Sequence, residues 1–345
     1  MIETPVVIEV VRGSVVESRH RAMIAAVDPA GHRLVSFGDT TRVTYLRSAA
    51  KPFQAIPLVA SGAARHFHLE RRELAVICGS HSGEPIHTEV VAGILQKIGL
   101  TADALGCGLH PPLDKETAKR VGDAGLTVLH HNCSGKHAGM LALARFRQQD
   151  VTTYLDPTHP VQQEILATIA RFAGMAPEEI AIGVDGCSAP TFALPIERMA
   201  LMYARLVNPD IVPLDGAQAE AAREIVQAMT EHPEMVGGTS HRLDTQLMQR
   251  APQRWVAKVG AEGVFTVGVF PSVRYPHGLG IAVKVEDGDD RRARDATLVE
   301  VLDQLGLLTP PLREALAPCR QVPLTNHRGL VVGEIRPVFQ LTIGL

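Results

Sequence analysis

Tyr45-Leu46-Arg47-Ser48-Ala49-Ala50-Lys51-Pro52-Phe53 is the stretch around which the rest of the chain can be arranged. Ser48 and Lys51 are three residues apart, and residues at this spacing lie on the same face of a helix. If a helix begins near Ser48, its hydroxyl and the Lys51 amine project side by side from a first turn that also tolerates Pro52. A serine becomes a nucleophile when a base takes its proton, and a lysine is such a base when burial or a second cation keeps it neutral. An N-cap serine followed by a surface lysine would give the same tetrapeptide.

The composition is that of a soluble globular protein with an ample core. The chain has 345 residues, of which 46% are hydrophobic and 21% charged, and its formal net charge is −3. This balance offers no basic face for nucleic acid. No apolar run approaches the roughly 18 residues of a transmembrane helix, and Glu3, Glu9 and Arg12 make the N-terminus unlike a signal peptide. We see no repeat or linker, and we expect one domain over residues 1–345.

The cysteines indicate a reducing compartment. They are odd in number and scattered, which argues against a disulfide framework and favours the cytoplasm. Thiols there are core residues, nucleophiles or metal ligands. The five are Cys78, Cys107, Cys133, Cys187 and Cys319.

Hydrophobic periodicity predicts strands at both ends of the chain and helices in the middle. We therefore expect an α/β (α+β) fold with an antiparallel sheet formed from both chain ends and an inserted helical region. Strands are predicted at 5–27, 33–37, 126–129, 180–184, 255–260, 264–270, 280–285 and 329–341. Helices are predicted at 48–60, 87–98, 138–146, 159–173, 196–206, 216–230 and 293–305.

Three small-residue segments outside the opening stretch carry polar side chains. Gly79 to Pro85 is a loop behind a buried segment, where backbone and hydroxyls can approach a ligand closely. Residues 130–137 read His-His-Asn-Cys-Ser-Gly-Lys-His, and residues 185–190 read Asp-Gly-Cys-Ser-Ala-Pro. Both of these segments follow a predicted short strand and precede a predicted helix, so Cys133 and Cys187 can lie at the same edge of the core.

Together with Arg47-Ser-Ala-Ala-Lys-Pro52, these segments resemble the L-asparaginases of the Rhizobium etli type, the class 3 asparaginases. The resemblance covers nearly the whole chain, and the cysteine-bearing motifs are its specific part. It implies a serine β-lactamase/glutaminase-like fold, a homodimer, and hydrolysis of L-asparagine to L-aspartate and ammonia.

The resemblance also implies roles for individual residues. The catalytic groups would be two Ser–Lys tandems, and a zinc ion would be held beside them. The tandems are Ser48 with Lys51 and Ser80 with Lys258; the zinc ligands are Cys133, Lys136 and Cys187; the substrate-site groups are Arg47, His137 and Asp185.

The residues themselves leave alternatives open at several of these positions. Lys258 on a strand would lower the pKa of Lys51, or would simply guard a sheet edge against aggregation. Ser80 would be a second nucleophile or a relay for Ser48, which we take as the attacking group. By residue type alone His137 would be the third zinc ligand, because lysine must first lose a proton. We expect zinc to orient the substrate more than to activate water.

Three rival functions remain. The first is another serine amidohydrolase on the same fold, a glutaminase or a β-lactam hydrolase, because a methylene changes binding by only about 1–3 kcal/mol. The second is self-cleavage at Gly238-Thr239 to expose a threonine nucleophile. The third is a zinc-holding binding protein without catalysis.

Overall fold

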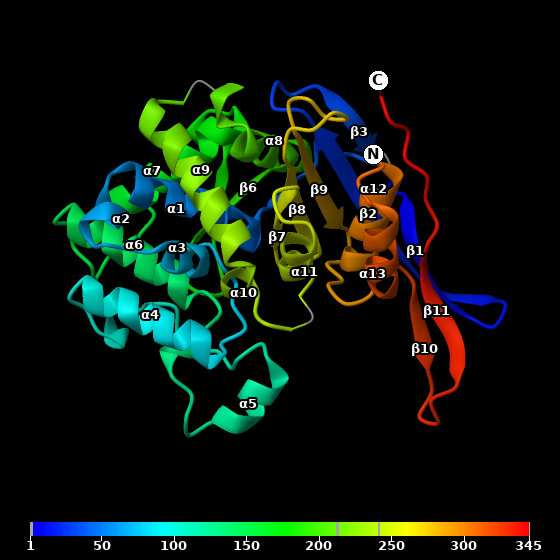
Figure 1. Cartoon of the computed structure of the whole chain (residues 1–345), viewed down its shortest axis with the longest axis horizontal. Coiled ribbons are helices and arrows are strands. Elements are labelled where there is room, and N and C mark those ends of the chain that lie inside the picture. Colours follow the sequence, from blue (N-terminus) through cyan, green and yellow to red (C-terminus); the bar gives the residue numbers. More distant parts are fainter. Residues whose placement is uncertain (1–2, 212–213, 241, 345) are drawn as a thin grey trace.

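An antiparallel sheet built from both ends of the chain forms the core of the computed structural model, which describes residues 3–211, 214–240 and 242–344. The strand order is β10-β11-β1-β2-β9-β8-β7, and β3 pairs with β2 to complete eight strands. N-terminal β1 and β2 thus lie between C-terminal β11 and β9 (Figure 1). This confirms the predicted sheet. The strands are β1 (Val6–Arg12), β2 (Val15–Val27), β3 (Arg33–Phe37), β7 (Trp255–Val259), β8 (Val264–Val269), β9 (Leu279–Val285), β10 (Val322–Thr325) and β11 (Val331–Pro337).

The strands at the β7 edge are covered by helices. Every residue of β7 and β8 is buried, as expected for near-continuous apolar runs with both faces packed. Helix α8 (Ile196–Val207) packs on β2, β8 and β9, and α12 (Arg294–Gln304) also contacts β8 and β9. The contact of α8 with β9 requires glycine, because a Cβ at Gly280 would lie 1.8 Å from the carbonyl oxygen of Ala200.

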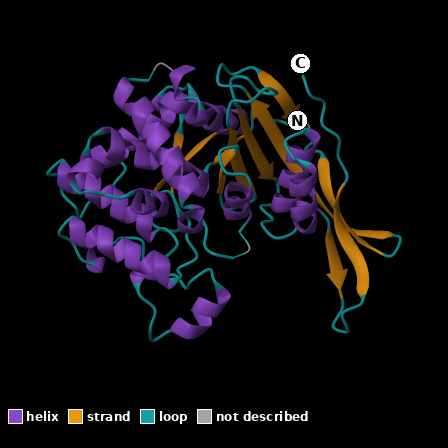
Figure 2. Ribbon diagram, viewed as in Figure 1, coloured by secondary structure: helices purple, strands orange, loops and turns teal. Residues whose placement is uncertain are grey.

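The chain between β4 and β7 is mainly helical and lies to one side of the large sheet (Figure 2). Its strands β5 and β6 form a three-stranded sheet with β4, in the order β4-β6-β5. None of the described helices is long and apolar enough to cross a membrane. The remaining strands and α-helices are β4 (Val43–Tyr45), α1 (Lys51–Ala60), α2 (Ala63–His66), α3 (Arg71–Ile77), α4 (Pro85–Lys97), α5 (Lys115–Val121), α6 (Ser134–Phe146), α7 (Pro160–Ala173), β5 (Ala181–Val184), β6 (Pro190–Pro195), α9 (Gly216–Glu231), α10 (Pro233–Val236), α11 (Leu243–Arg250) and α13 (Pro310–Arg320).

Close packing of α1, α3 and α6 positions the polar segments. A Cβ at Gly135 of α6 would lie 2.4 Å from the carbonyl oxygen of Val76 in α3. One turn later, a Cβ at Gly139 would lie 2.6 Å from Cγ2 of Ile77. The two glycines let α6 rest directly on α3, so that the residues before each helix converge.

Several predicted elements were wrong in detail. Residues 126–129 are not a strand: Val128–His130 is a 3₁₀ turn, in which the Thr127 amide donates to Nδ1 of His130, so its polar groups are satisfied locally. Ser48 lies in a 3₁₀ turn (Arg47–Ala50), and the α-helix begins only at Lys51. After Asp185-Gly-Cys-Ser-Ala189 the chain forms strand β6 before the predicted helix.

Candidate active site

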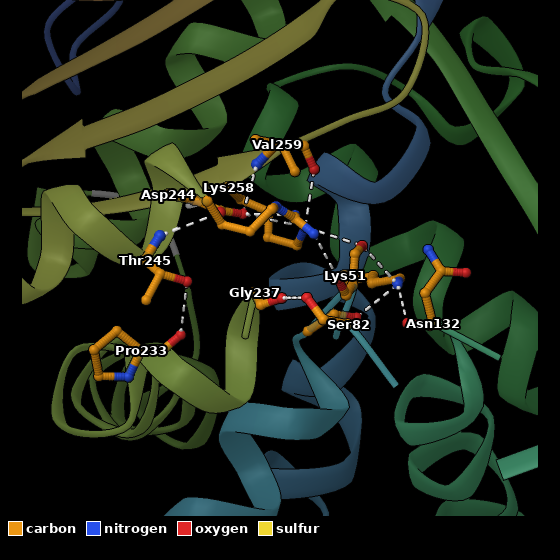
Figure 3. A network of polar contacts seen from close by, with 12 residues as sticks. Lys51, Ser82, Asn132, Pro233, Gly237, Asp244, Thr245, Lys258 and Val259 are labelled. Atoms are coloured by element: carbon orange, nitrogen blue, oxygen red, sulfur yellow. Dashed lines mark hydrogen bonds and ion pairs between the residues drawn. The ribbon is translucent and has the colours of Figure 1, made fainter. Parts of the chain in front are cut away.

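The Lys51 amine is buried at the start of α1 and is directed at the loop after α3. Its Nζ lies 2.9 Å from Oγ of Ser80, 2.6 Å from the carbonyl oxygen of Gly79 and 3.3 Å from that of Asn132. Figure 3 shows the amine pointing toward Asn132. Two N–H groups on the two carbonyls leave the third position of the nitrogen facing the Ser80 hydroxyl. A neutral amine in this position would accept the hydroxyl proton.

A second lysine reaches the same hydroxyl from the large sheet. Lys258 of β7 is fully buried, and its Nζ lies 3.0 Å from Oγ of Ser80 and 2.9 Å from the carbonyl oxygen of Val259. The Ser80 oxygen therefore lies between two buried amines. Because a hydroxyl has a single proton, it can donate to only one of them and must accept from the other.

A buried carboxylate lies behind Lys258. Oδ2 of Asp244 is 4.0 Å from Nζ of Lys258 and 3.2 Å from Nη2 of Arg242, and the Val259 amide donates to it at 3.4 Å. Arg242 also donates through Nη1 to the carbonyl oxygen of Ser80 at 3.1 Å. In Figure 3, Asp244 lies beside Lys258 and Val259.

Burial and crowded cations shift the pKa values of these groups. Burial lowers the pKa of Lys258 well below its ordinary value, Asp244 opposes this, and Lys51 and Arg242 reinforce it. Burial also lowers the pKa of Lys51. Burial alone would raise the pKa of Asp244, but the adjacent Arg242 and Lys258 hold it below its ordinary value. A lysine with a lowered pKa next to a serine, such as Lys51 beside Ser80, is suited to proton transfer near neutral pH.

Ser48 is more accessible than Ser80. Ser48 is half-buried, whereas Ser80 is 4% exposed and enclosed by amines. Within the described part of the chain the Ser48 hydroxyl forms no hydrogen bond to Lys51, whose amine is directed at Ser80 instead. The predicted side-by-side pair along one helix is thus replaced by contacts across the fold.

Arg47 and Asp185 form an ion pair next to Ser48. Arg47 adopts a positive φ of 51°, and its Nε and Nη2 lie 3.0 Å and 2.9 Å from Oδ1 of Asp185. The Gly186 amide donates to the same oxygen at 2.8 Å. Burial raises the pKa of Asp185, but the cations Lys136 and Arg47 bring it below its ordinary value. Nη1 of Arg47 lies 3.8 Å from Oε1 of the exposed Glu262, and Oδ2 of Asp185 can bind a cationic group.

The two cysteines and the lysine predicted as zinc ligands lie together. Cys133 caps the N-terminus of α6, and Lys136 from its first turn places Nζ 3.0 Å from Sγ of Cys187 on the β5–β6 turn. The hydrogen bond with Cys187 lowers the pKa of Cys133 well below its ordinary value, against the effect of burial. Buried thiols are ligands that zinc prefers, and the Lys136 amine could join them only after losing its proton, which would leave one tetrahedral position. Across the described ranges no group of three His, Cys, Asp or Glu side chains could hold a metal.

His137 is bonded through Nδ1 to Tyr154 and has a second ring nitrogen that is buried. The Gly106 amide donates to the Tyr154 hydroxyl at 2.8 Å, and that hydroxyl lies 2.6 Å from Nδ1 of His137. If the hydroxyl donates to Nδ1, the proton of the neutral ring is on Nε2, which is buried and has no partner in the described structure. Burial lowers the pKa of His137 to about 4, so the ring is neutral. A ring protonated at Nε2 is a donor rather than a metal ligand there, which favours Lys136 over His137 as third ligand.

The structure brings most of the predicted site residues together, whereas the Ser48 hydroxyl forms no hydrogen bond to Lys51 or Ser80 within the described residues. They form three adjoining groups: the serine–lysine network, the Arg47–Asp185 pair and the thiol cluster, with Lys51 contacting the carbonyl of the residue before Cys133. Sequence reasoning missed Arg242, Asp244 and Tyr154. The only signal for Asp244 was its place in the first turn of a helix, where acidic residues are common for dipole reasons.

A loop predicted as a possible self-cleavage site is held by Glu84. The Thr239 amide and hydroxyl donate to the two carboxylate oxygens at 3.0 Å and 2.6 Å, and Ser82 donates to the Gly237 carbonyl. These bonds fasten the segment after α10 to the loop that carries Ser80.

Comparison with known proteins gives a family and remote structural neighbours. Similar solved structures include a probable glutaminase from Bacillus subtilis complexed with 6-diazo-5-oxo-L-norleucine, at 14% identity over 83% of this chain and 84% of that chain, with a TM-score of 0.39. Another is a β-lactamase from Burkholderia ambifaria, at 16% identity over 84% and 95% of the two chains, with a TM-score of 0.40. A search of curated proteins found no match. The family model for L-asparaginase II matches residues 8–337, nearly the whole chain, and the protein is therefore a member of the L-asparaginase II family.

Proposed function

We propose that the chain is an L-asparagine amidohydrolase of the Rhizobium etli type. Its family supports an amidohydrolase, and the observation that carries the proposal is the Ser80 oxygen held between the amines of Lys51 and Lys258. A serine nucleophile needs a neighbouring group that takes its proton, and the second serine and the two lysines can provide it, so these residues are suited to acyl transfer. We further propose that the protein is a homodimer and acts in the cytoplasm.

In the proposed reaction Ser48 attacks the side-chain amide carbon of asparagine. Its proton passes to the Lys51 amine by way of the Ser80 hydroxyl, and ammonia leaves with a proton as the C–N bond breaks. Water then hydrolyses the ester, which releases aspartate and restores Ser48. Ser48 has the attacking role because it is the more exposed serine, and Ser80 is enclosed by donors and acceptors.

The Arg47–Asp185 pair is suited to bind the charged end of an amino acid. Nη1 of Arg47 would take the α-carboxylate in place of its contact with the exposed Glu262, and Oδ2 of Asp185 would take the α-ammonium group. His137 would donate from Nε2 to the bound substrate. These three groups would hold the substrate while its amide lies at Ser48.

Cys133, Lys136 and Cys187 would hold a zinc ion. When bound, the metal would supply a Lewis-acidic position that orients a polar group of the substrate. The proton transfers assigned to Ser48, Ser80 and the two lysines do not pass through it.

The test is ammonia release from L-asparagine by wild type, Ser48→Ala and Ser80→Ala, with zinc measured on each preparation. We expect Ser48→Ala to lose turnover and retain zinc, and Ser80→Ala to retain a small residual rate. Full turnover in Ser48→Ala would mean that Ser80 or a metal-bound water is the nucleophile. Faster release from L-glutamine, or hydrolysis of a chromogenic lactam, would favour the other amidohydrolases. Binding of zinc and asparagine without ammonia would leave a binding protein.

A further inference from the structure

We propose that Asp244 is a positioning residue that holds Lys258 as an ammonium ion against the Ser80 oxygen. This inference deepens the proposed function, on which its catalytic meaning depends. The two lysines next to Ser80 would then have different tasks, with Lys258 as the cationic donor to its oxygen.

The polar atoms within reach of the Lys258 amine are suited to an ammonium ion, which opposes the effect of burial. The carbonyl oxygen of Val259, at 2.9 Å, is an acceptor only, and the carboxylate of Asp244, at 4.0 Å, also lacks a proton. A neutral amine would turn a lone pair toward one of these acceptors or toward the Ser80 oxygen. An ammonium can instead direct its three N–H groups toward the carbonyl, the carboxylate and the hydroxyl oxygen.

Asp244 is held as an anion by its own contacts. It is fully buried in the first turn of α11, where the amides of Thr245 and Val259 donate to Oδ1 and Oδ2 at 3.1 Å and 3.4 Å. Arg242 lies 3.2 Å from Oδ2. Amide donors and a guanidinium stabilise the ionised form, so a negative charge stays opposite Lys258.

The charges around Lys258 otherwise disfavour its protonation. The cations Lys51 and Arg242 lower the pKa of Lys258, and Arg294 helps to lower the pKa of Asp244. Of the buried thiols nearby, Cys133 raises the pKa of Lys258 as Asp244 does, and Lys258 lowers that of Cys78. Asp244 is therefore the fixed carboxylate that offsets both burial and the neighbouring cations at Lys258.

The first experiment measures stability and needs no substrate. Asp244→Asn is made in wild type and in Lys258→Met, and thermal unfolding of the four proteins is compared. In wild type the substitution should lower the melting temperature, because it removes the counterion of Lys258. In the Lys258→Met background the carboxylate has lost a partner, so the same substitution should be clearly less harmful or even stabilising. Equal effects in both backgrounds would show no coupling and would overturn the proposal.

The second experiment measures the pH dependence of kcat for ammonia release. Loss of the neighbouring anion lowers the pKa of Lys258, so the alkaline limb should move to lower pH by about 1–3 units in Asp244→Asn. Asp244→Glu should restore part of the shift. Glu73→Gln is the matched control, because it also removes a buried carboxylate from a lysine, Lys97, at 2.6 Å. It should lower stability without moving the limb.

The two experiments separate the inference from the proposed function. An unmoved alkaline limb in an active Asp244→Asn enzyme would overturn the positioning role. If wild type releases no ammonia from asparagine, glutamine or a lactam, the proposed function fails, and the stability coupling alone decides whether Asp244 holds Lys258.

Discussion

The contact between α6 and α3 allows a quantitative test of how the site is held. Gly135 and Gly139 lie one turn apart on α6, and both face α3, but they meet different atoms. A Cβ at Gly135 would be 2.4 Å from the carbonyl oxygen of Val76 and 2.9 Å from its carbonyl carbon. At Gly139 it would meet Cγ2 of Ile77 at 2.6 Å, which is the end of a side chain. We predict that Gly135→Ala is much the more damaging substitution.

The loss of stability expected for each substitution depends on whether the atoms that meet the added Cβ can move away. A backbone carbonyl within α3 cannot rotate away, so α6 must shift by several tenths of an ångström, and such overpacking costs about 1–3 kcal/mol. Gly135 is in the first turn, where the gain in helix propensity is smaller than the roughly 1 kcal/mol of a helix interior. At Gly139 that full gain offsets a change in the Ile77 side chain of about 0.5–1.5 kcal/mol. Gly139→Ala should thus be near neutral, and Gly135→Ala destabilising by about 1–3 kcal/mol.

A shift of α6 also moves the site, because Cys133 and Lys136 are at its N-terminus. A misplacement of 1 Å can cost about 10²-fold in rate, so a smaller shift should cost on the order of tenfold. Urea unfolding, ammonia release and zinc content would be measured on Gly135→Ala, Gly139→Ala and wild type. If Gly135→Ala proved as stable and active as Gly139→Ala, the close approach of α6 to α3 would not be what holds these residues.

Two further predictions concern the histidines of the Ser80 loop and the thiol cluster. His81 and His87 are neutral, because each Nδ1 accepts a backbone N–H and burial lowers both pKa values below 6.5. Since the unfolded chain binds these protons more readily, the free energy of unfolding should fall as the pH drops below 6.5. Urea unfolding of His81→Gln at several pH values should show a shallower dependence of this free energy on pH. An unchanged dependence would contradict the neutral assignment. Separately, Cys133→Ser and Cys187→Ser should each lose zinc in metal analysis while Cys319→Ser keeps it, and stoichiometric zinc in either of the first two would remove that thiol from the ligand set.

The fold was predictable wherever burial leaves a periodic pattern. The strands near 255–285 are runs of β-branched and aromatic residues, and they were predicted because both of their faces are packed. Strand β10 was missed because it is four residues long, half-exposed and contains Pro323. Helix α13 was missed because Pro310, Pro311 and Pro318 resemble a loop, although a first-turn proline suits a helix. The predicted strand at 126–129 failed because local hydrogen bonds satisfied its polar groups in place of a neighbouring strand.

The site shows where local reasoning ends. Helical spacing relates Ser48 to Lys51, but the Lys51 amine bonds with Ser80, which is 29 residues away, and Lys258 reaches the same oxygen from 178 residues away. Such contacts depend on how α1, the loop after α3 and β7 pack, and no pattern within one segment encodes that arrangement. The same limit applies to Asp244, whose charge is ordinary for a helix start and acquires its meaning only from complete burial beside Lys258. A buried anion is costly unless it is paired. The position of Asp244 beside Lys258 therefore argues that Asp244 sets the charge state of Lys258 and is not there to stabilise the helix.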